Sequence, residues 1–374
     1  MKKLKFKKIK SSLNGASGDS FFLVCVRMVT LVFSLLMTRI LSGHFSVYEY
    51  GTYSQIILLS TTITTLTILG MTDGLNYFFC REKCEQKRDS YVATLFTLQV
   101  IVSIVAAIVV LACTIPISKY FDNSDIKGLI IFAAALPFLQ NTISLLQIMF
   151  IAIRKAKLIA IRNLAVSILK LIAILLACYL FDNIVIVLIC QVILELIQIV
   201  YFFIVLRKNN YRVNIRLFDR TLLGEILKYC IPMAVFTMVK SLNKDCDKLM
   251  IAAFTDTETL ALYTNASKQL PFDTIMIAFC TVLIPYLTRY IADKNYDQAK
   301  RVYKAFLELS YISTNVLACA AICTAPEVIE FLYTAKYLSG IGIFITYILV
   351  DIFAVMNLTL LLSAAGKTKT IMFI

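Results

Sequence analysis

Three lysines share one face of a helix inside an otherwise apolar segment. Lys240, Lys244 and Lys248 are spaced i, i+4 and i+8, so a helix places their ammonium groups in one stripe. Ammonium groups this close together repel one another unless anions or water lie opposite them. The stripe therefore predicts a hydrated, cation-rich surface that binds an anionic group. The alternative is a set of paired charges without a ligand, in which Lys248 pairs with Asp245 or Asp247.

Further charged residues fall inside apolar segments. A charge at the centre of a bilayer costs at least about 2.5 kcal/mol on insertion scales, so such residues usually face a cavity or a partner. Arg27 and Lys268 are additional candidate anion ligands, and Arg27 can instead pair with Asp73. Three carboxylates are candidates for carrying coupling protons, binding Na⁺ or pairing with cations, namely Asp247, Glu308 and Asp351.

Two other sites at membrane depth are expected to be structural. Lys170 and Glu195 fall near the middles of adjacent segments joined by the short link Asp182-Asn183, which favours a direct ion pair. Arg39 falls near the end of the first segment, where a long cationic side chain can extend to the interface. Both sites therefore predict contacts that stabilise the fold.

The composition is that of a membrane protein. The chain has 374 residues, of which 60% are hydrophobic and only 16% charged, against about 25% charged in soluble domains. Its mean hydropathy of +0.82 excludes a disordered chain and argues against a soluble enzyme. About twenty apolar residues span a bilayer as a helix. We therefore predict an all-α polytopic membrane protein with ten spanning helices, at residues 20–41, 53–79, 91–117, 129–153, 158–181, 184–206, 226–254, 260–287, 302–325 and 338–365.

The excess of positive charge, +14, mostly records the orientation of these helices. Lysine and arginine gather in the leader before the first helix and then in every second loop, which is the pattern of cytoplasmic loops. This alternation predicts a cytoplasmic N-terminus. In so apolar a chain the basic residues do not indicate a nucleic-acid partner.

Two short motifs recur at a nearly constant distance. Residues 50–53 (Tyr-Gly-Thr-Tyr) resemble 261–263 (Ala-Leu-Tyr), and 151–157 resemble 363–369, with offsets of 210 and 212 residues. Six helices separate the copies, so the two halves share one orientation, as in transporters built from parallel repeats. Because the counterpart of the fifth helix would begin near residue 370, we expect a twelve-helix protein of which ten helices are present. The expected organisation is a basic cytoplasmic leader at 1–19, a six-helix lobe at 20–206, a cytoplasmic linker at 207–225, and a second lobe at 226–374 that stops after its fourth helix.

The order of the motifs resembles that of the Wzx-type lipid-linked oligosaccharide flippases, a family of the MATE-like MOP exporter superfamily. The resemblance rests on residues 39–42 (Arg-Ile-Leu-Ser), 49–53 (Glu-Tyr-Gly-Thr-Tyr), 229–232 (Tyr-Cys-Ile-Pro), 247–248 (Asp-Lys), Tyr263 and 325–333 (Ala-Pro-Glu-Val-Ile-Glu-Phe-Leu-Tyr). It implies two six-helix lobes in a V around a central cavity. It also implies alternating-access transport of a polyprenyl-pyrophosphate-linked oligosaccharide across a bacterial cytoplasmic (inner) membrane, for O-antigen, capsule or exopolysaccharide synthesis.

In that setting we expect the anionic head group of the substrate to be bound by Arg27, Lys240, Lys244 and Lys268. The expected partners are the bilayer and the polysaccharide polymerase and chain-length machinery. No metal or cofactor is expected besides a coupling ion, H⁺ or Na⁺.

Two alternatives to a flippase remain. A MATE-type multidrug or cation antiporter of the same superfamily would favour an acidic cavity for its cationic drugs, so the lysine stripe argues against it. A membrane-embedded polysaccharide polymerase or ligase fits poorly because the loops predicted outside are short. We therefore expect a transporter and not an enzyme.

Overall fold

The computed structural model describes residues 25–82, 84–153, 156–209, 211, 215–267, 287, 290–291 and 295–354. All regular structure within these ranges is helical. The first helix of the described residues is Cys25–His44. It continues with α2 (Val47–Thr67), α3 (Met71–Arg81), α4 (Glu85–Ala112), α5 (Thr114–Tyr120), α6 (Ile126–Ala152), α7 (Ala156–Leu176), the π-helix η1 (Ala177–Phe181), α8 (Ile184–Lys208), η2 (Ile215–Leu217), η3 (Arg220–Leu222), α9 (Leu223–Phe254), α10 (Thr257–Ala266), α12 (Tyr296–Cys323), α13 (Ala325–Tyr333), η4 (Ala335–Gly340) and α14 (Ile341–Ala354).

The described residues contain seven helices that are long and apolar enough to cross a membrane, or eight if the bent pair α2 and α3 is one span. These eight correspond to eight of the ten predicted spans. The predicted spans at 260–287 and 338–365 lie partly outside the described residues, which hold α10 and α14 at their beginnings. The prediction of an all-helical, multi-pass membrane protein is confirmed, while the count of ten stays a prediction.

The order of the helices supports the predicted repeat. Ser46 caps α2 through a capping box: its Oγ accepts a hydrogen bond from the N–H of Glu49, whose carboxylate accepts one from the N–H of Ser46. Asp256, 210 residues later, caps α10 by accepting a 2.6 Å hydrogen bond from the N–H of Thr259. Moreover, α4 and α12 each have 28 residues, and each is followed by a short helix.

Replacing Asp256 by alanine is expected to lower the free energy of unfolding by about 1 kcal/mol, because the first turn of α10 loses its cap. Asp256→Asn is the matched control, since its amide oxygen also caps a helix. The hydrogen bonds from Thr259 lower the pKa of Asp256. The stabilisation by the charged form is therefore present above the pKa of the unfolded chain, and it is lost as the pH falls through the lower folded value. Unfolding in detergent at neutral and acidic pH checks this, and equal losses in both variants would contradict it.

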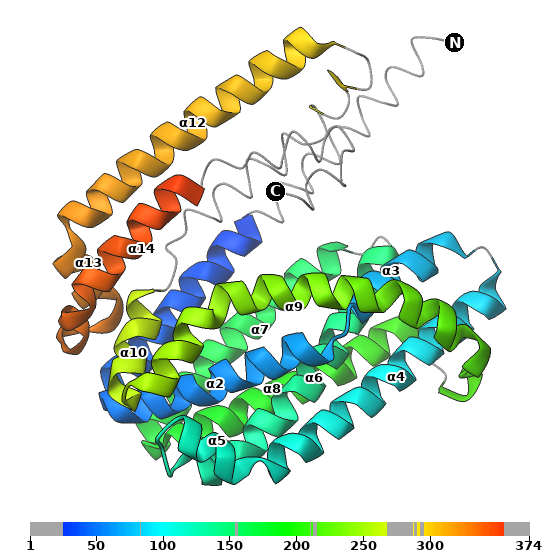
Figure 1. The fold of residues 1–374 in the computed structure, drawn as a ribbon, viewed down its shortest axis with the longest axis horizontal. Helices are drawn as coiled ribbons and strands as arrows, with labels where there is room; N and C mark the ends of the chain where they lie inside the picture. The colour runs from blue at the N-terminus through cyan, green and yellow to red at the C-terminus, as the bar shows by residue number, and fades with distance from the viewer. Residues whose placement is uncertain are drawn as a thin grey trace. The chain divides into compact units, whose positions relative to one another are not determined.

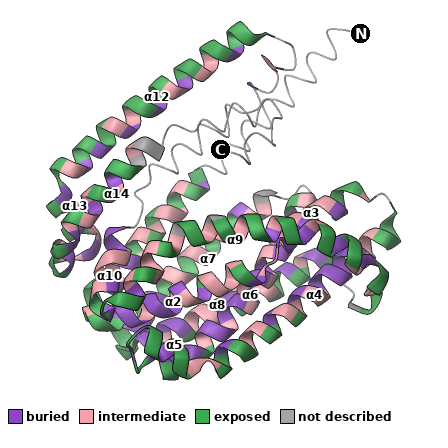
Figure 2. Ribbon diagram, in the orientation of Figure 1, coloured by how far each residue is buried: buried purple, intermediate pink, exposed green. Residues whose placement is uncertain are grey.

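The described residues divide into two compact units, Ile40–Thr264 and a second one that contains residues 25–39 and the described residues between 265 and 354. In the first unit, α6 is the central helix and packs against α2, α3, α4 and α8 (Figure 1). Of the apolar stretch of α6, 61% is buried, against 28% for α4 and 17% for α7. Figure 2 shows the same contrast along the ribbon. Two apolar clusters fill this unit, one around α3, α4 and the start of α9 and the other around α2, α6 and α10.

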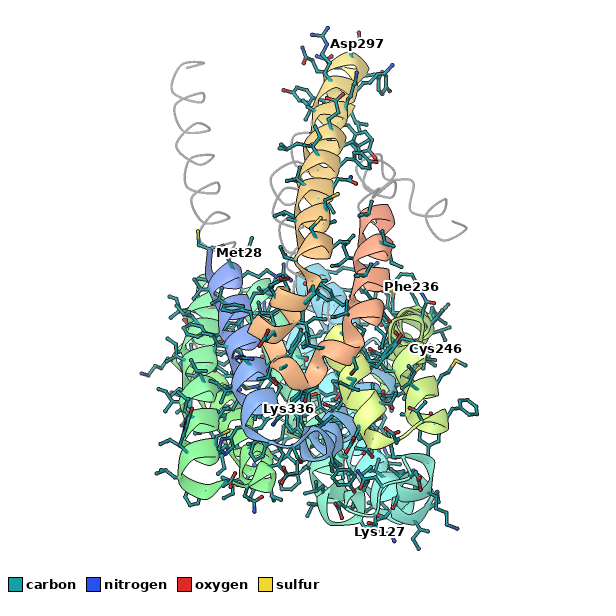
Figure 3. The ribbon with its side chains drawn as sticks, turned by 90° about the vertical axis from the view of Figure 1, so that its left-hand side faces the viewer. Met28, Lys127, Phe236, Cys246, Asp297 and Lys336 are labelled. Carbon is teal, nitrogen blue, oxygen red and sulfur yellow. The ribbon has the colours of Figure 1, made fainter. Side chains whose placement is uncertain are left out.

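The second unit contains α12, α13, η4 and α14, with α12 packed against α14. Figure 3 places Asp297, in the first turn of α12, and Lys336, in η4, at opposite ends of these helices. Residues near 297 belong to a predicted cytoplasmic loop and Lys336 to a predicted outer loop. The course of α12 is therefore that of a helix crossing between the two predicted faces.

The span formed by α2 and α3 is bent by 41° where it meets α9. Leu69 and Gly70 have φ values of 45° and 65° at the break. A Cβ atom on Gly70 would lie 2.6 Å from the carbonyl oxygen of Cys230 and 2.9 Å from the backbone nitrogen of Ala234. Gly70 therefore provides both the left-handed turn and the close approach of α9.

Candidate functional site

α9 carries the predicted lysine stripe on one uninterrupted helix. It runs from Leu223 to Phe254, so the spacing of Lys240, Lys244 and Lys248 does place them along one face. The side chains of Lys240 and Lys244 lie outside the description. Lys248 Nζ lies 3.3 Å from Asp245 Oδ1, so for Lys248 the structure shows the pairing that the alternative interpretation of the stripe expected. Of the three lysines in the stripe, Lys248 is thus the one whose partner the structure describes.

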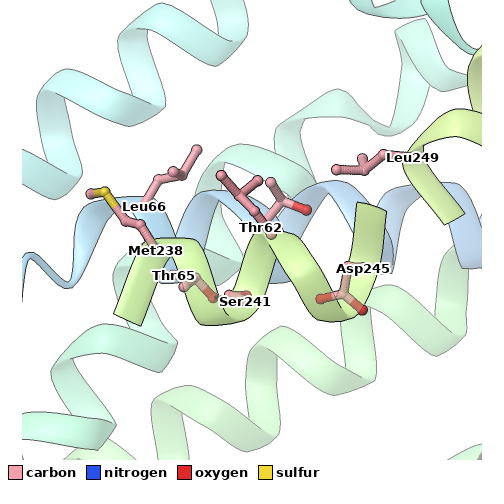
Figure 4. Close-up of a pocket in the computed structure, with 8 residues that line it drawn as sticks. Thr62, Thr65, Leu66, Met238, Ser241, Asp245 and Leu249 are labelled. Carbon is pink, nitrogen blue, oxygen red and sulfur yellow. Dashed lines mark hydrogen bonds between the residues drawn. The ribbon is translucent and has the colours of Figure 1, made fainter. Parts of the chain in front are cut away.

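The polar segment of α9 lies against the hydroxyl-rich face of α2. Thr62 and Thr65 of α2 and Ser241 and Asp245 of α9 line a small pocket between these helices, together with the apolar side chains of Leu66, Met238, Leu242 and Leu249 (Figure 4). Ser241 Oγ donates a 3.3 Å hydrogen bond to Thr65 Oγ1. We call this contact, formed by Thr62, Thr65, Ser241 and Asp245, the α2–α9 polar contact.

The hydroxyl groups of α2 were not among the residues selected from the sequence. The signal was present, because residues 60–67 read Ser-Thr-Thr-Ile-Thr-Thr-Leu-Thr within an apolar span. Thr62 Oγ1 donates to the carbonyl oxygen of Leu58 at 2.8 Å, and Thr65 Oγ1 to that of Thr61 at 3.0 Å. These bonds satisfy the hydroxyl protons within the helix, as a bilayer requires, and they leave acceptor oxygens on the surface of α2.

Asp247, a candidate coupling carboxylate, is connected to α10. Its Oδ2 accepts a 2.7 Å hydrogen bond from the hydroxyl of Tyr263, and its Oδ1 accepts a 2.8 Å bond from the N–H of Lys248. Asp247 and Tyr263 belong to two of the motifs that carry the resemblance. Their contact joins the end of the lysine-bearing helix to the helix that follows it.

The other candidates from the sequence are dispersed. Arg27 is exposed on the helix Cys25–His44, and Glu308 is exposed on α12, where it lies 3.6 Å from Lys304. Asp351 lies on α14 with its side chain outside the description, and Lys268 lies outside the described residues. The roles predicted for Arg27, Lys240, Lys244, Lys268, Asp247, Glu308 and Asp351 stay predictions.

Arg39 makes the kind of structural contact that was expected. Its NH1 donates a 2.6 Å hydrogen bond to the carbonyl oxygen of Glu330, in the last turn of α13. The carbonyl end of a helix carries partial negative charge, so a guanidinium group there is stabilising. Arg39 thus ties the first helix to α13 within one unit.

The direct ion pair predicted between Lys170 and Glu195 is wrong. Their charges interact across the contact between α7 and α8, but the two side chains, both described, form no ion pair within 4.0 Å. Glu195 Oε1 instead accepts a 3.3 Å hydrogen bond from Gln140 Nε2 of α6. The sequence spacing of α7 and α8 did not reveal that a third helix would supply this donor.

A further polar cavity, of about 170 Å³, lies where α3, α4 and the start of α9 meet. Two cations and two carboxylates line it, together with two aromatic rings: Arg81, Lys87, Glu82, Glu225, Phe78 and Tyr91. The Tyr91 hydroxyl donates a 2.6 Å hydrogen bond to Glu225, which fixes the start of α9 against α4.

The apolar spans, with charged and hydroxyl groups within them, define a polytopic, all-helical membrane protein. The fold is similar to that of an inward-facing multidrug resistance MATE family transporter of the MOP superfamily, with a TM-score of 0.69 and 12% identity over 94% of this chain and 85% of that chain. It is also similar to the lipid II flippase MurJ in an inward closed conformation, with a TM-score of 0.78 and 15% identity over 92% of this chain and 76% of that chain. A MOP superfamily transporter from Pyrococcus furiosus gives a TM-score of 0.58 at 14% identity, over 94% and 82% of the two chains.

The family model described as "Polysaccharide biosynthesis protein" matches residues 36–341, and the chain belongs to this family. This confirms the predicted relationship to a family of polysaccharide biosynthesis proteins, and the fold is similar to those of MOP superfamily transporters. No curated protein matches the chain. The structural neighbours include both a drug transporter and a lipid flippase, so the fold alone does not distinguish these two classes.

Proposed function

We propose that this protein moves a polyprenyl-pyrophosphate-linked oligosaccharide from the inner to the outer leaflet of a bacterial cytoplasmic membrane by alternating access. The observation that carries the proposal is the family match over residues 36–341. The transporter fold supports movement of the molecule across the membrane instead of its chemical conversion. The flipped product would then be available to the polymerase and chain-length machinery of surface polysaccharide synthesis.

The chemistry of α9 suits such a substrate. Ammonium groups bind phosphate oxygens through charge-assisted hydrogen bonds, which are about twice as strong as neutral ones. Lys240 and Lys244 would bind the pyrophosphate, assisted by Arg27 and Lys268. The hydroxyl oxygens of the α2–α9 polar contact would accept hydrogen bonds from sugar hydroxyls. A cationic drug would meet repulsion at the same lysines.

The orientation proposed for this cycle places the N-terminus in the cytoplasm, because basic residues concentrate in alternate loops. The substrate would enter from that side.

Transport in proteoliposomes tests the proposal. The purified chain is reconstituted in vesicles that hold a fluorescent polyprenyl-pyrophosphate oligosaccharide, and the fraction accessible to an external quencher is followed with time. Vesicles containing the protein are expected to equilibrate the two leaflets, while protein-free vesicles should not. Efflux of cationic dyes without movement of the lipid-linked sugar would favour the antiporter instead.

A further inference from the structure

Glu195 is a buried carboxylate with an incomplete set of partners. It lies in the middle of α8 and is only 4% exposed. One carboxylate oxygen accepts the hydrogen bond from Gln140, and the other, Oε2, has no hydrogen-bond partner. Burying a carboxylate in this way is unfavourable for the charged form, so the site stores free energy that a bound cation or proton would release.

Four helices supply the groups around Glu195. Gln140 of α6 is held in place because its Oε1 accepts a 2.9 Å hydrogen bond from Thr64 of α2. α2 also brings the phenol of Tyr53 near the carboxylate, and α7 brings the ammonium group of Lys170. On α8 itself, the side-chain amide of Gln191 also interacts with the carboxylate of Glu195. Lys170 is thus the one basic group, and Tyr53 the one other titratable group, that the described parts of these helices bring to the carboxylate.

These surroundings suit a proton better than a metal ion. A sodium ion needs several oxygen ligands, yet Gln140 presents its N–H to the carboxylate and its oxygen to Thr64. The positive charge of Lys170 would also repel a metal ion. A proton needs only Oε2 itself, and Lys170 is close enough to balance the carboxylate when the proton leaves, since no direct ion pair holds either group.

We propose that Glu195 binds the coupling proton of this transporter, with Lys170 as the cation that balances the deprotonated form. This rests on the proposed transport function. The proton comes from water on one side of the membrane, forms the O–H bond on Glu195, and returns to water on the other side as the carboxylate reforms. In this scheme, proton binding changes the attraction between α7 and α8. When Glu195 is deprotonated, its negative charge attracts the positive charge of Lys170, and when Glu195 is protonated this attraction is lost.

Infrared difference spectroscopy between acidic and alkaline pH tests the site in the reconstituted full chain, without any substrate. The wild type is expected to show the C=O band of a buried protonated carboxyl group, and Glu195→Gln should lose it. Glu258→Gln, which alters an exposed carboxylate at the start of α10, should retain it. Lys170→Met should shift the titration to higher pH, because the carboxylate loses its balancing cation.

A band that persists in Glu195→Gln would overturn the proposal. So would a band that added Na⁺ removes at constant acidic pH, since the site would then take a metal ion. Circular dichroism and gel filtration of each variant show whether it is folded, and Gln keeps the shape of Glu and an acceptor for Gln140.

The transport measurement then connects the site to coupling. An imposed pH gradient is expected to accelerate lipid-linked sugar movement in wild-type vesicles, and Glu195→Gln should abolish this acceleration while Glu258→Gln preserves it. An unaltered response in Glu195→Gln would contradict the coupling role. If wild-type vesicles move no lipid-linked sugar while the infrared titration remains as expected, the proposed substrate fails but the proton site stands.

Discussion

The double variant Lys240→Ala/Lys244→Ala is expected to lose lipid-linked sugar transport by about 100-fold or more. Each hydrogen bond to a charged group contributes about 1.5–3 kcal/mol, so two lysines supply at least about 3 kcal/mol, and each 1.4 kcal/mol is a factor of ten. The vesicle assay measures the rate directly. Restoration of surface polysaccharide in a bacterium that lacks its own flippase provides the cellular readout.

Two further variants make the result specific. Lys228→Ala removes an exposed lysine from the start of the same helix, outside the stripe, and is expected to transport normally. Lys240→Arg/Lys244→Arg keeps both charges and should retain most of the activity. Normal polysaccharide from the double alanine variant would refute the cationic binding surface. An equal loss in Lys228→Ala would show that net charge on α9, and not the stripe, is what transport requires.

Gly70→Ala is expected to destabilise the protein by about 2–5 kcal/mol. A non-glycine residue in the left-handed region costs about 1–2 kcal/mol, and overpacking typically costs about 1–3 kcal/mol more. The added Cβ would meet the backbone of α9 at Cys230 and Ala234, and backbone atoms cannot move aside as a side chain can. Denaturant or thermal unfolding in detergent measures the change.

Gly224→Ala is the matched control for this prediction. Gly224 belongs to α9, and nothing lies within 4 Å of the position that its Cβ would take. Alanine there should be neutral or stabilising, by up to about 1 kcal/mol. Similar losses in both variants would show that the approach of α9 to Gly70 does not determine stability.

Much of the fold could be predicted because hydropathy reports directly on the length of membrane helices. The orientation and the repeat, inferred from loop charges and recurring motifs, stay predictions, although the helix caps at Ser46 and Asp256 are consistent with the repeat. The break at Gly70 could not be predicted from the sequence, because whether a glycine interrupts a helical span depends on what packs against it.

The site was predicted only where its residues interact locally. The pairing of Lys248 with Asp245 spans one helical turn and was foreseen. The contact of Ser241 with Thr65 and the donor that Gln140 provides to Glu195 join residues far apart in the chain. Helical periodicity determines which face of a helix is polar, but not which distant helix meets that face or at what height.

The α2–α9 polar contact has a mechanical consequence. Because the protons of Thr62 and Thr65 are bonded to carbonyl groups of α2 itself, withdrawing α9 breaks none of these bonds. Only the 3.3 Å bond from Ser241 to Thr65 would have to be replaced, and water can replace it. Hydrogen bonding at this contact therefore opposes a small shift of α9 along α2 only weakly. The resistance to such a shift comes from the apolar packing on either side, which is tightest where α9 approaches Gly70.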